Sequence, residues 1–424
     1  MKFTVKTIGC KVNIYETNKI IQMLEDNGFE FVDIENNKDF LDLDFFIVNT
    51  CSVTSIADKK SRQILHAAKR KYKDAKIIAI GCFVDSLYLS NDTKSILKES
   101  LADVFVKNSE KDKLPDILNS YTSNAVKNAE FKDKNKHYNV RQFIKIQDGC
   151  DEFCTYCLIP YLRGRIKSRN EEDILLELKK LLLNDVKEIV LTGIHISSYG
   201  LDFENMLYEN DGAIDISRKK LISLLEKVAK ITVDGKTFER IRLGSLEPRI
   251  INDEFVKKLC SGELKNKFCH NFTLSLQSGS DKILKLMNRH YTTLDFENAV
   301  NIIRKFMNDV TITVDIIVGF PGETEEDFND TLNFVKKMRF YNPNIFPYSK
   351  RKGTKAAEME NQLTNNEKHN RVKYLISVCE SITKEIEEEH KANNDILVED
   401  EIYENGKKYA IGYTKEYIKR KILL

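Results

Sequence analysis

The chain has 424 residues, and its 67 lysine and arginine residues nearly balance its 65 aspartate and glutamate residues. The length predicts two to three domains, because a typical domain has roughly 150 residues. A hydrophobic content of 42% and a charged content of 31% are typical of a soluble globular protein and exclude collagen-like, wholly disordered and membrane-embedded classes. The formal net charge of +2 also excludes a polyanion binder held by its overall field, so any nucleic-acid site must be a local basic patch.

Neither a membrane segment nor a secretion signal is visible in the sequence. No apolar run approaches the roughly 18 residues that a membrane span needs. The start, MKFTVKTIGCK, lacks the continuous apolar core of a signal peptide. We therefore expect a cytoplasmic protein with no membrane partner.

The N-terminal part of the chain alternates short apolar strands with amphipathic helices. Residues 3–10, 44–51 and 75–82 are β-rich runs that each end on a cysteine, and residues 13–28 and 57–73 have apolar residues at helical spacing. Such alternation predicts a parallel sheet, in which the carboxyl ends of the strands lie along one edge. Cys10, Cys51 and Cys82 can therefore converge, although a free cysteine is also a common small core residue.

A second group of cysteines is clustered in the sequence itself. Cys150, Cys154 and Cys157 form a CxxxCxxC pattern. A structural zinc site usually has four ligands, whereas this run supplies three in a chain with only seven histidines. Three thiolates on a four-iron cluster leave one iron open for a substrate or cofactor, so the pattern favours an iron–sulfur cluster, with zinc as the alternative. The nine cysteines are an odd number, which fits a disulfide framework badly.

From residue 143 the chain repeats strand and helix. The expected strands are 143–149, 188–193, 240–245, 272–277, 312–319 and 344–349, which predicts an α/β fold with an open, partial parallel (βα)6 barrel. Barrel active sites lie at the carboxyl ends of the strands, and the candidate residues follow these ends: Cys150, Gly193, His195, Ser245, Glu247, Gln277, Ser278 and Asp315. The plainer interpretations are a turn residue for His195, a buried hydrogen-bonding partner for Asp315 and a helix start for residues 278–280.

These patterns also predict the domain boundaries. An N-terminal α/β domain covers residues 1–120, a polar linker 121–138 and the barrel domain 139–370. A connecting helix, 371–393, ends a helical stretch that begins near Leu363, and a short β module covers 394–424. Cys260, Cys269 and Cys379 have no motif around them, so we expect them to be structural.

Local basic stretches offer RNA contacts despite the balanced net charge. The stretch RGRIKSR directly follows the second cysteine group, so Arg163, Arg165 and Arg169 are the predicted phosphate contacts. Another basic stretch spans residues 350–352. The helix after Cys51 places basic residues along one face, for which an ordinary solvated surface is the alternative; these residues are Lys59, Arg62, His66, Lys69 and Lys73.

Several motifs together resemble one enzyme family over nearly the whole chain. A CxxxCxxC that opens a partial barrel, with the aromatic Tyr156 before its last cysteine, resembles the radical S-adenosylmethionine enzymes. The strings TIGCKVNIYET, NTCSVT, LSLQSGSD, DIIVGFPGETEEDF and PYSKRKGTKAAEM resemble the methylthiotransferase branch of that superfamily. Within this branch, GCKVNIYET and QDGCDEFCTYCLIPYLRGRIKSR are most similar to the type that acts on N6-threonylcarbamoyladenosine in tRNA.

The resemblance implies two [4Fe-4S] clusters and S-adenosylmethionine as cofactors. The CxxxCxxC cysteines would ligate the cluster at which S-adenosylmethionine is cleaved to a 5′-deoxyadenosyl radical. Cys10, Cys51 and Cys82 would hold an auxiliary cluster that carries the sulfur to be transferred. The radical would remove hydrogen from carbon 2 of the adenine 3′ of the anticodon, and a methylthio group, methylated by a second S-adenosylmethionine, would take its place. The expected pocket around the cofactor is Tyr156, Gly193, Ser245, Gln277 and Asp315.

The resemblance also implies partners and a tail. The expected partners are tRNA, a flavodoxin-like or ferredoxin-like electron donor and a sulfur donor, with a monomeric enzyme. The family ends in a small β-barrel RNA-binding module of the TRAM type, and residues 394–424 resemble only its first strands, with Gly412, Tyr413, Thr414 and Tyr417 in the familiar places. The sequence stops at Leu424 before such a barrel could close, so we expect a reduced or truncated module with unpaired strand edges.

Two alternatives stand beside this hypothesis. The same chemistry could act on isopentenyladenosine in tRNA or on an aspartate of a ribosomal protein. In a different functional class, the cysteines could stabilise a zinc-containing RNA-binding module without catalysis.

Overall fold

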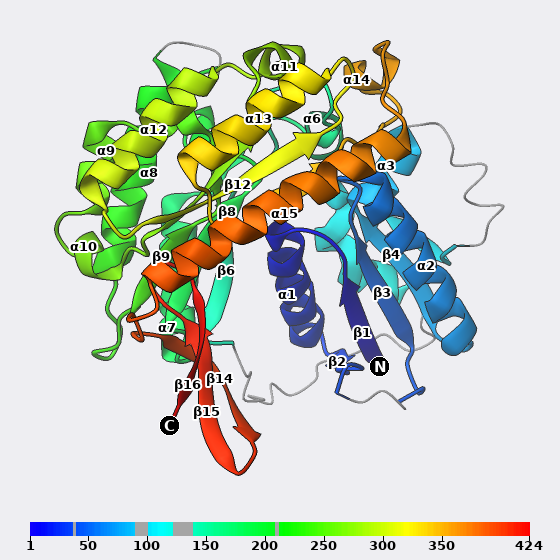
Figure 1. Cartoon of the computed structure of the whole chain (residues 1–424). Helices are drawn as coiled ribbons and strands as arrows, with labels where there is room; N and C mark the ends of the chain where they lie inside the picture. The colour runs from blue at the N-terminus through cyan, green and yellow to red at the C-terminus, as the bar shows by residue number, and fades with distance from the viewer. Residues whose placement is uncertain (37–39, 90–100, 122–138, 208–211) are drawn as a thin grey trace. The chain divides into compact units, whose positions relative to one another are not determined.

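The computed structural model describes residues 1–36, 40–89, 101–121, 139–207 and 212–424 (Figure 1). The chain divides into two compact units. Unit 1 comprises Met1–Asn135, Cys157–Gly164 and Ser349–Thr354, and unit 2 comprises Lys136–Tyr156, Arg165–Tyr348 and Lys355–Leu424. Two short segments from the predicted barrel domain therefore belong to unit 1. The predicted linker lies outside the described residues, apart from Tyr121.

Unit 1 is built on the predicted parallel sheet, with strand order β2-β1-β3-β4-β5. The strands are β1 (Lys2–Thr7), β2 (Glu30–Phe31), β3 (Phe45–Thr50), β4 (Lys76–Gly81) and β5 (Val104–Val106). All four pairings are parallel. The helical segments are α1 (Lys11–Asp26), α2 (Ser55–Lys71), α3 (Cys82–Leu89), η1 (Asn108–Lys113), α5 (Leu114–Asn119) and α6 (Ile159–Arg163).

The sheet of unit 1 separates two hydrophobic cores. Phe46 and Val48 of β3 belong to a core that includes Leu65 of α2. The alternate residues Phe45 and Ile47 belong to a second core with helix α1. Successive side chains of a strand point to opposite faces, so the continuous apolar runs of the central strands match a parallel sheet covered on both sides.

Unit 2 contains the predicted partial barrel. Its strands form two sheets, ordered β7-β6-β8-β9 and β10-β11-β12-β13. The two sheets are linked in two ways. Only Gly244 separates β9 from β10, and a parallel bridge joins Ile241 of β9 to Phe268, three residues before β11. Except for the short antiparallel β7, the pairings are parallel. The strands are β6 (Arg141–Asp148), β7 (Lys167–Ser168), β8 (Glu188–Gly193), β9 (Arg240–Leu243), β10 (Ser245–Leu246), β11 (Asn271–Gln277), β12 (Thr311–Val318) and β13 (Asn344–Pro347).

Helices alternate with these strands along the chain, as the sequence pattern predicts. Because parallel strands need crossover connections, each main strand is followed by at least one helical segment. The helices are α7 (Glu171–Leu183), α8 (Ala213–Lys230), α9 (Asp253–Leu259), α10 (Leu264–Lys267), α11 (Asp281–Leu286), α12 (Thr293–Phe306), α13 (Glu325–Met338), α14 (Lys355–Glu358) and α15 (Asn365–Glu389). Helix α15 begins with a capping box formed by Thr364 and Glu367. The predicted connecting helix corresponds to the later part of α15.

The C-terminal strands form a three-stranded antiparallel sheet that packs on the barrel strands of unit 2. The strands are β14 (Leu397–Glu404), β15 (Lys407–Tyr413) and β16 (Lys419–Leu423). Arg240 of β9 donates hydrogen bonds to the backbone oxygens of Tyr413 and Asp395. The small sheet is therefore anchored to the barrel (Figure 1). Within the described parts of the chain, no helix combines the length and apolar character that a membrane crossing requires.

Candidate functional site

The three N-terminal cysteines follow three adjacent strands of the unit 1 sheet. Cys51 and Cys82 come directly after β3 and β4, and Cys10 is the N-cap residue of α1, three residues after β1. The order of these strands is β1-β3-β4, so the predicted convergence at one sheet edge is what the topology produces. Cys10 is exposed, whereas Cys51 and Cys82 are buried.

The glycines before Cys10 and Cys82 allow the chain to pass close to its neighbours. Gly9 has φ +111°, and a Cβ atom built there would lie 2.7 Å from Sγ of Cys51. Gly81 has φ +99°, and a Cβ atom there would lie 2.5 Å from the backbone oxygen of Thr50. Both positions need a residue that tolerates positive φ and has no side chain.

The thiols of this group influence one another electrostatically. Burial raises the pKa of Cys51 to about 11, and the neighbouring thiols of Cys10 and Cys82 act in the same direction. Burial also raises the pKa of Cys82, and the positive charges of Arg163 and Lys111 oppose that rise. Together with the close approach of Gly9 to Sγ of Cys51, these effects fit three thiols that lie near one another, which is the arrangement that a multi-thiolate ligand set needs.

Arg163 lies inside unit 1 and contacts this cysteine group directly. Its Nε donates to Sγ of Cys82 over 3.2 Å. Its terminal nitrogens bind both carboxylate oxygens of Glu16, at 2.9 and 3.2 Å, and the side-chain oxygen of Asn13 at 3.1 Å. The Arg163 side chain is only 2% exposed. Arg163 is one of the predicted phosphate contacts, and in this structure the buried Glu16 carboxylate binds its guanidinium, so its role in RNA binding stays a prediction.

The neighbouring arginines of the same stretch remain nearer the solvent, in unit 2. The side chain of Arg165 is 60% exposed and lies 3.1 Å from Asp151. Arg169 is partly buried, 2.8 Å from Glu177. Of the predicted phosphate contacts, Arg165 is thus the most accessible, and the roles of Arg165 and Arg169 in RNA binding stay predictions.

In the other basic stretches, some residues contact neighbouring side chains and others are exposed to solvent. Arg351 is buried in unit 1, where it lies 2.7 Å from Asp58 and donates to the hydroxyl of Ser52 at 2.7 Å. On α2, Arg62 lies over the ring of Phe83, and Lys69 lies 3.2 Å from Asp103. Lys59 and His66 of α2 are exposed, as is Lys73, which lies two residues after the helix ends.

The CxxxCxxC segment begins at the end of β6 and is fixed by the chain around it. The Gln147 side chain donates to the backbone oxygens of Asp148 and Gly149 at 2.6 and 2.8 Å. Thr155 donates from its backbone nitrogen to the backbone oxygen of Met287 and from its hydroxyl to that of Leu286. Both acceptors lie at the C-terminal end of α11. The boundary between the two units falls between Tyr156 and Cys157, so Cys150 and Cys154 belong to unit 2 and Cys157 to unit 1.

A second arginine contacts a cysteine in this segment. Arg289 donates from a terminal nitrogen to Sγ of Cys154 at 3.2 Å and from Nε to the hydroxyl of Tyr291 at 3.1 Å. The Tyr291 hydroxyl in turn donates to the backbone oxygens of Ser275 and Leu276 at the end of β11. Arg289 is thereby held between a strand end and a cysteine.

Buried carboxylates surround the same part of unit 2. Arg249 lies 2.7 Å from Glu247 and 3.0 Å from Glu152. Burial raises the pKa of Glu152 to about 7, against the opposing positive charge of Arg289. Burial lowers the pKa of the His195 imidazole to about 3, and the charges of Arg289 and Arg249 lower it further. His195 is therefore neutral at physiological pH.

Of the predicted pocket residues, Gln277 ends β11 and Ser245 begins β10 just after β9. Asp315 lies inside β12, three residues before its end, so its predicted place after a strand end is wrong. The Ser245 hydroxyl lies 3.5 Å from a carboxylate oxygen of Asp315, whose other oxygen accepts from the Asn344 side chain at 2.9 Å. Gln277 has φ +65° and pairs with Ile316, the residue after Asp315. The structure thus brings together residues from β10, β11, β12 and β13, and Asp315 also has the hydrogen-bonding role that was its plainer interpretation.

The other two predicted pocket residues, Gly193 and Tyr156, have neighbours different from those of Ser245, Gln277 and Asp315. A Cβ atom at Gly193 would lie 2.7 Å from the backbone oxygen of Gln147, and the Gln147 side-chain oxygen accepts from the backbone nitrogen of His195 at 2.7 Å. Tyr156 packs edge-to-face against Phe320, with ring centres 6.3 Å apart. Their roles in cofactor binding stay predictions.

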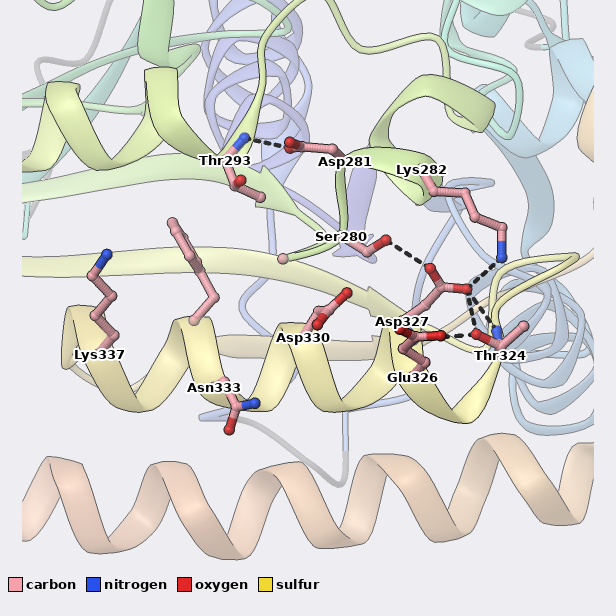
Figure 2. A pocket seen from close by; sticks show the side chains of 12 residues that line it. Ser280, Asp281, Lys282, Thr293, Thr324, Glu326, Asp327, Asp330, Asn333 and Lys337 are labelled. Atoms are coloured by element: carbon pink, nitrogen blue, oxygen red, sulfur yellow. Dashed lines mark hydrogen bonds and ion pairs between the residues drawn. The ribbon is translucent and has the colours of Figure 1, made fainter.

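The SGS sequence after β11 attaches helix α13 to the barrel. Ser280 donates to a carboxylate oxygen of Asp327 at 2.8 Å, and Lys282 and Thr324 bind the other oxygen (Figure 2). A Cβ atom at Gly279 would lie 2.7 Å from Cα of Thr331. A polar pocket of about 640 Å³ lies beside these residues, and since its lining is occupied with holding α13, we assign it no cofactor. The plainer interpretation of residues 278–280 fits this arrangement.

Sequence reasoning missed Arg289, Gln147 and the function of Arg163 beside Cys82. Each has a polar partner distant in the chain: 135 residues separate Arg289 from Cys154, 81 separate Arg163 from Cys82, and 48 separate Gln147 from His195. No spacing pattern in a single sequence signals such pairs. Cys260, Cys269 and Cys379 lie away from both groups in the chain, and burial raises the pKa of each thiol, as expected for structural cysteines.

Family models match both halves of this arrangement. The model described as the Radical SAM superfamily matches residues 144–335, within the barrel of unit 2. The model described as Uncharacterized protein family UPF0004 matches residues 2–106, the sheet of unit 1. The fold and the cysteine segment of unit 2 are therefore those of the radical S-adenosylmethionine class.

Curated relatives align along almost the whole chain. Threonylcarbamoyladenosine tRNA methylthiotransferase MtaB of Bacillus subtilis (strain 168) is 34% identical over 427 residues, covering 97% of this chain and 88% of the relative. The tRNA-2-methylthio-N(6)-dimethylallyladenosine synthase of Caldicellulosiruptor saccharolyticus is 36% identical over 396 residues, covering 90% of this chain and 78% of the relative. The chain therefore belongs to the family of radical S-adenosylmethionine tRNA methylthiotransferases, enzymes that use S-adenosylmethionine and [4Fe-4S] clusters.

A solved structure supports the fold. The radical S-adenosylmethionine methyltransferase TsrM from Kitasatospora setae, with cobalamin and a [4Fe-4S] cluster bound, is 14% identical, with a TM-score of 0.57 over 84% of this chain and 77% of that chain. At this identity the likeness concerns the fold alone.

Proposed function

We propose that this enzyme methylthiolates carbon 2 of N6-threonylcarbamoyladenosine at the position 3′ of the tRNA anticodon. The supporting observation is the extent of the alignments. The threonylcarbamoyladenosine enzymes of Bacillus subtilis and Aquifex aeolicus cover 97% and 92% of this chain and 88% and 91% of their own lengths. The dimethylallyladenosine enzymes of Caldicellulosiruptor saccharolyticus and Clostridioides difficile (strain 630) cover 90% and 97% of this chain, but only 78% and 83% of their own lengths. The identities, 34%, 34% and 36%, do not separate the two substrates.

The two cysteine groups fit two clusters of the [4Fe-4S] type. Each group offers three thiols, and each contains a cysteine whose sulfur accepts a hydrogen bond from an arginine. Thiolate ligands and hydrogen bonds to sulfur are the ordinary surroundings of such clusters. In this proposal Cys150, Cys154 and Cys157 hold the radical-generating cluster, and Cys10, Cys51 and Cys82 hold the auxiliary cluster.

The bound cofactors supply the chemistry: radical removal of a hydrogen atom, and the sulfur and methyl group that take its place. The chain's own residues position them. The Ser245 hydroxyl, the Asp315 carboxylate and the Asn344 amide form one hydrogen-bonded set on β10, β12 and β13 that can bind the polar groups of S-adenosylmethionine. The close approach of Gly193 to Gln147 leaves no room for a side chain at that strand end. Burial of Cys51 and Cys82 keeps water from the sulfur atoms.

The partners in this proposal are tRNA, an electron donor and a sulfur donor. Arg165, with its largely exposed side chain, is the proposed phosphate contact that follows the cysteine segment. Phosphate contacts of this kind make RNA affinity depend on salt.

The test is the nucleoside content of tRNA. The chain is expressed in a bacterial host that lacks its own threonylcarbamoyladenosine methylthiotransferase, and digested tRNA is analysed by mass spectrometry, with Cys51→Ala as the inactive control. We expect 2-methylthio-N6-threonylcarbamoyladenosine with the unaltered chain and none with the control. Appearance of only the isopentenyl product would transfer the assignment to that substrate.

Purification distinguishes the non-catalytic alternative. The anaerobically purified enzyme should be brown and contain about eight iron ions per chain, since two [4Fe-4S] clusters are expected. A colourless protein that contains zinc and leaves tRNA unmodified would support the RNA-binding module instead.

A further inference from the structure

In each cysteine group, an arginine N–H group points at a cysteine sulfur. In unit 1, Nε of Arg163 lies 3.2 Å from Sγ of Cys82. In unit 2, a terminal nitrogen of Arg289 lies 3.2 Å from Sγ of Cys154. Both contacts are charge-assisted, because a guanidinium remains protonated in proteins. The same device thus occurs in both groups.

The surroundings of Arg163 fix its orientation toward Cys82. Both carboxylate oxygens of Glu16 accept from its two terminal nitrogens, which leaves Nε aimed at the sulfur. Glu16 is itself buried, and Lys111 binds one of its oxygens at 2.6 Å. A guanidinium is planar, so fixing one edge by two hydrogen bonds fixes the direction of the third.

Cys82 receives a second, weaker N–H contact in the same network. The side-chain nitrogen of Asn108 lies 3.6 Å from its sulfur. The packing is completed by Leu158 and Leu162, which form an apolar cluster with Cys82. Arg163 therefore reaches Cys82 from the end of a helix whose own residues cover that cysteine.

The orientation of Arg289 has a different origin. Its Nε donates to the hydroxyl of Tyr291, which is anchored on two backbone oxygens at the end of β11. The neighbouring residue Asn288 donates to the backbone oxygens of Glu152 and Phe153, within the cysteine segment. The arginine and the loop that carries Cys154 are thus held to each other by backbone and side-chain contacts.

We propose that Arg163 and Arg289 are positioning residues that each donate a charged hydrogen bond to one cysteine ligand and thereby set the reduction potentials of the two clusters independently. A hydrogen bond to a ligating sulfur withdraws electron density and stabilises the reduced, more negative form of the cluster. Its loss therefore moves the potential of that cluster to more negative values. The inference rests on the proposed assignment of a cluster to each cysteine group.

The experiment compares Arg163→Met and Arg289→Met in the full chain after anaerobic cluster reconstitution. Methionine removes the charge and the N–H donors and keeps an unbranched side chain. Iron and sulfide contents are measured, and the midpoint potential of each cluster is followed by EPR at a series of applied potentials. The clusters are observed separately in full chains that also carry alanine at either all three CxxxCxxC cysteines or all three N-terminal cysteines.

The two variants serve as controls for each other. We expect Arg163→Met to shift only the auxiliary potential, and Arg289→Met to shift only the radical-cluster potential, both to more negative values. Arg163→Lys and Arg289→Lys keep the charge without the planar donor set, so their shifts should be smaller. Arg165→Met removes an exposed arginine and should change neither potential. Unchanged potentials in both methionine variants would overturn the proposal.

Two additional measurements keep the outcome interpretable. Arg163→Met leaves the buried Glu16 with less compensation, so the double variant Glu16→Gln/Arg163→Met removes both charges and the N–H donors together and should show the same shift with the circular dichroism of the unaltered chain. If that double variant holds its auxiliary cluster at the unaltered potential, the role of Arg163 is refuted. If the unaltered N-terminal cysteines hold no iron when the CxxxCxxC cysteines are alanine, the auxiliary-cluster assignment itself fails.

Discussion

The guanidinium carbon of Arg242 lies 3.3 Å from the ring centre of Tyr417. Arg242 belongs to barrel strand β9, and Tyr417 lies in the turn between β15 and β16. Tyr417 also stacks on Tyr413, with ring centres 4.5 Å apart, and Arg141 of β6 lies over both rings. The C-terminal sheet is thus attached to the barrel by stacked arginine and tyrosine side chains, which are contacts that retain their strength when partly buried.

Replacement of Tyr417 by alanine should loosen the C-terminal sheet. We expect a loss of about 2 kcal/mol from the docking of β14–β16, the size of a partly desolvated cation–π contact. Hydrogen exchange of the backbone amides of these strands should become faster. The matched control is Tyr403→Ala, since the Tyr403 side chain is in the same sheet and 77% exposed. Equal exchange in both variants would contradict this function of Tyr417.

The N-terminal cysteines should react with iodoacetamide at very different rates in cluster-free protein. Cys10 is exposed, and Cys51 is buried with its pKa raised to about 11. Only the thiolate reacts, so at pH 8 roughly one Cys51 side chain in a thousand is reactive. Mass spectrometry of modified peptides should show Cys10 alkylated first. Urea-denatured protein is the control, because all cysteines should react alike there; fast modification of Cys51 in the folded chain would contradict the buried geometry.

Arg165 should contribute to the salt dependence of tRNA binding. If its exposed guanidinium contacts a phosphate, Arg165→Gln should reduce the slope of log K against log salt by roughly 1. Filter-binding or fluorescence anisotropy over a salt series measures this slope. Lys305→Gln makes the same charge change at a side chain that is 64% exposed and should leave the slope unaltered. Identical slopes for both variants and the unaltered chain would rule out the Arg165 contact.

His195 should make the stability of the enzyme depend on pH. Its pKa is lowered to about 3 by burial, whereas a histidine in an unfolded chain has a pKa of about 6.5. The unfolded state therefore binds a proton that the folded state does not, so stability is lost as the pH falls from about 6.5 toward 3, by up to about 1.4 kcal/mol per pH unit.

The test compares thermal midpoints at pH 7.5 and 5.5 for the unaltered chain and His195→Asn. The difference between the two pH values should be smaller in the variant, because its side chain does not titrate. His66→Asn, at an exposed position of α2, should retain the full difference. A variant at position 195 with an undiminished pH dependence would show that another group is responsible.

The positions of the cysteines were predictable because they depend on backbone order alone. Cys51 and Cys82 each end an apolar run, and once alternating strands and helices form a parallel sheet, the ends of its strands must share an edge. The same reasoning predicted the six barrel strands and placed Ser245 at a strand end, whereas Asp315 lies within β12. Local periodicity carries this information, since it reports which residues are buried on which face.

What only the tertiary structure decided is the direction of the polar side chains. Arg163 and Arg165 are two residues apart in one basic stretch, yet Arg163 is bound to Glu16, 147 residues away in the chain, and Arg165 has a 60% exposed side chain. A buried charge requires an oppositely charged partner, and the location of that partner depends on long-range packing. The sequence by itself therefore determined where the cysteine sulfurs lie in the fold, and tertiary packing determined which cations contact them.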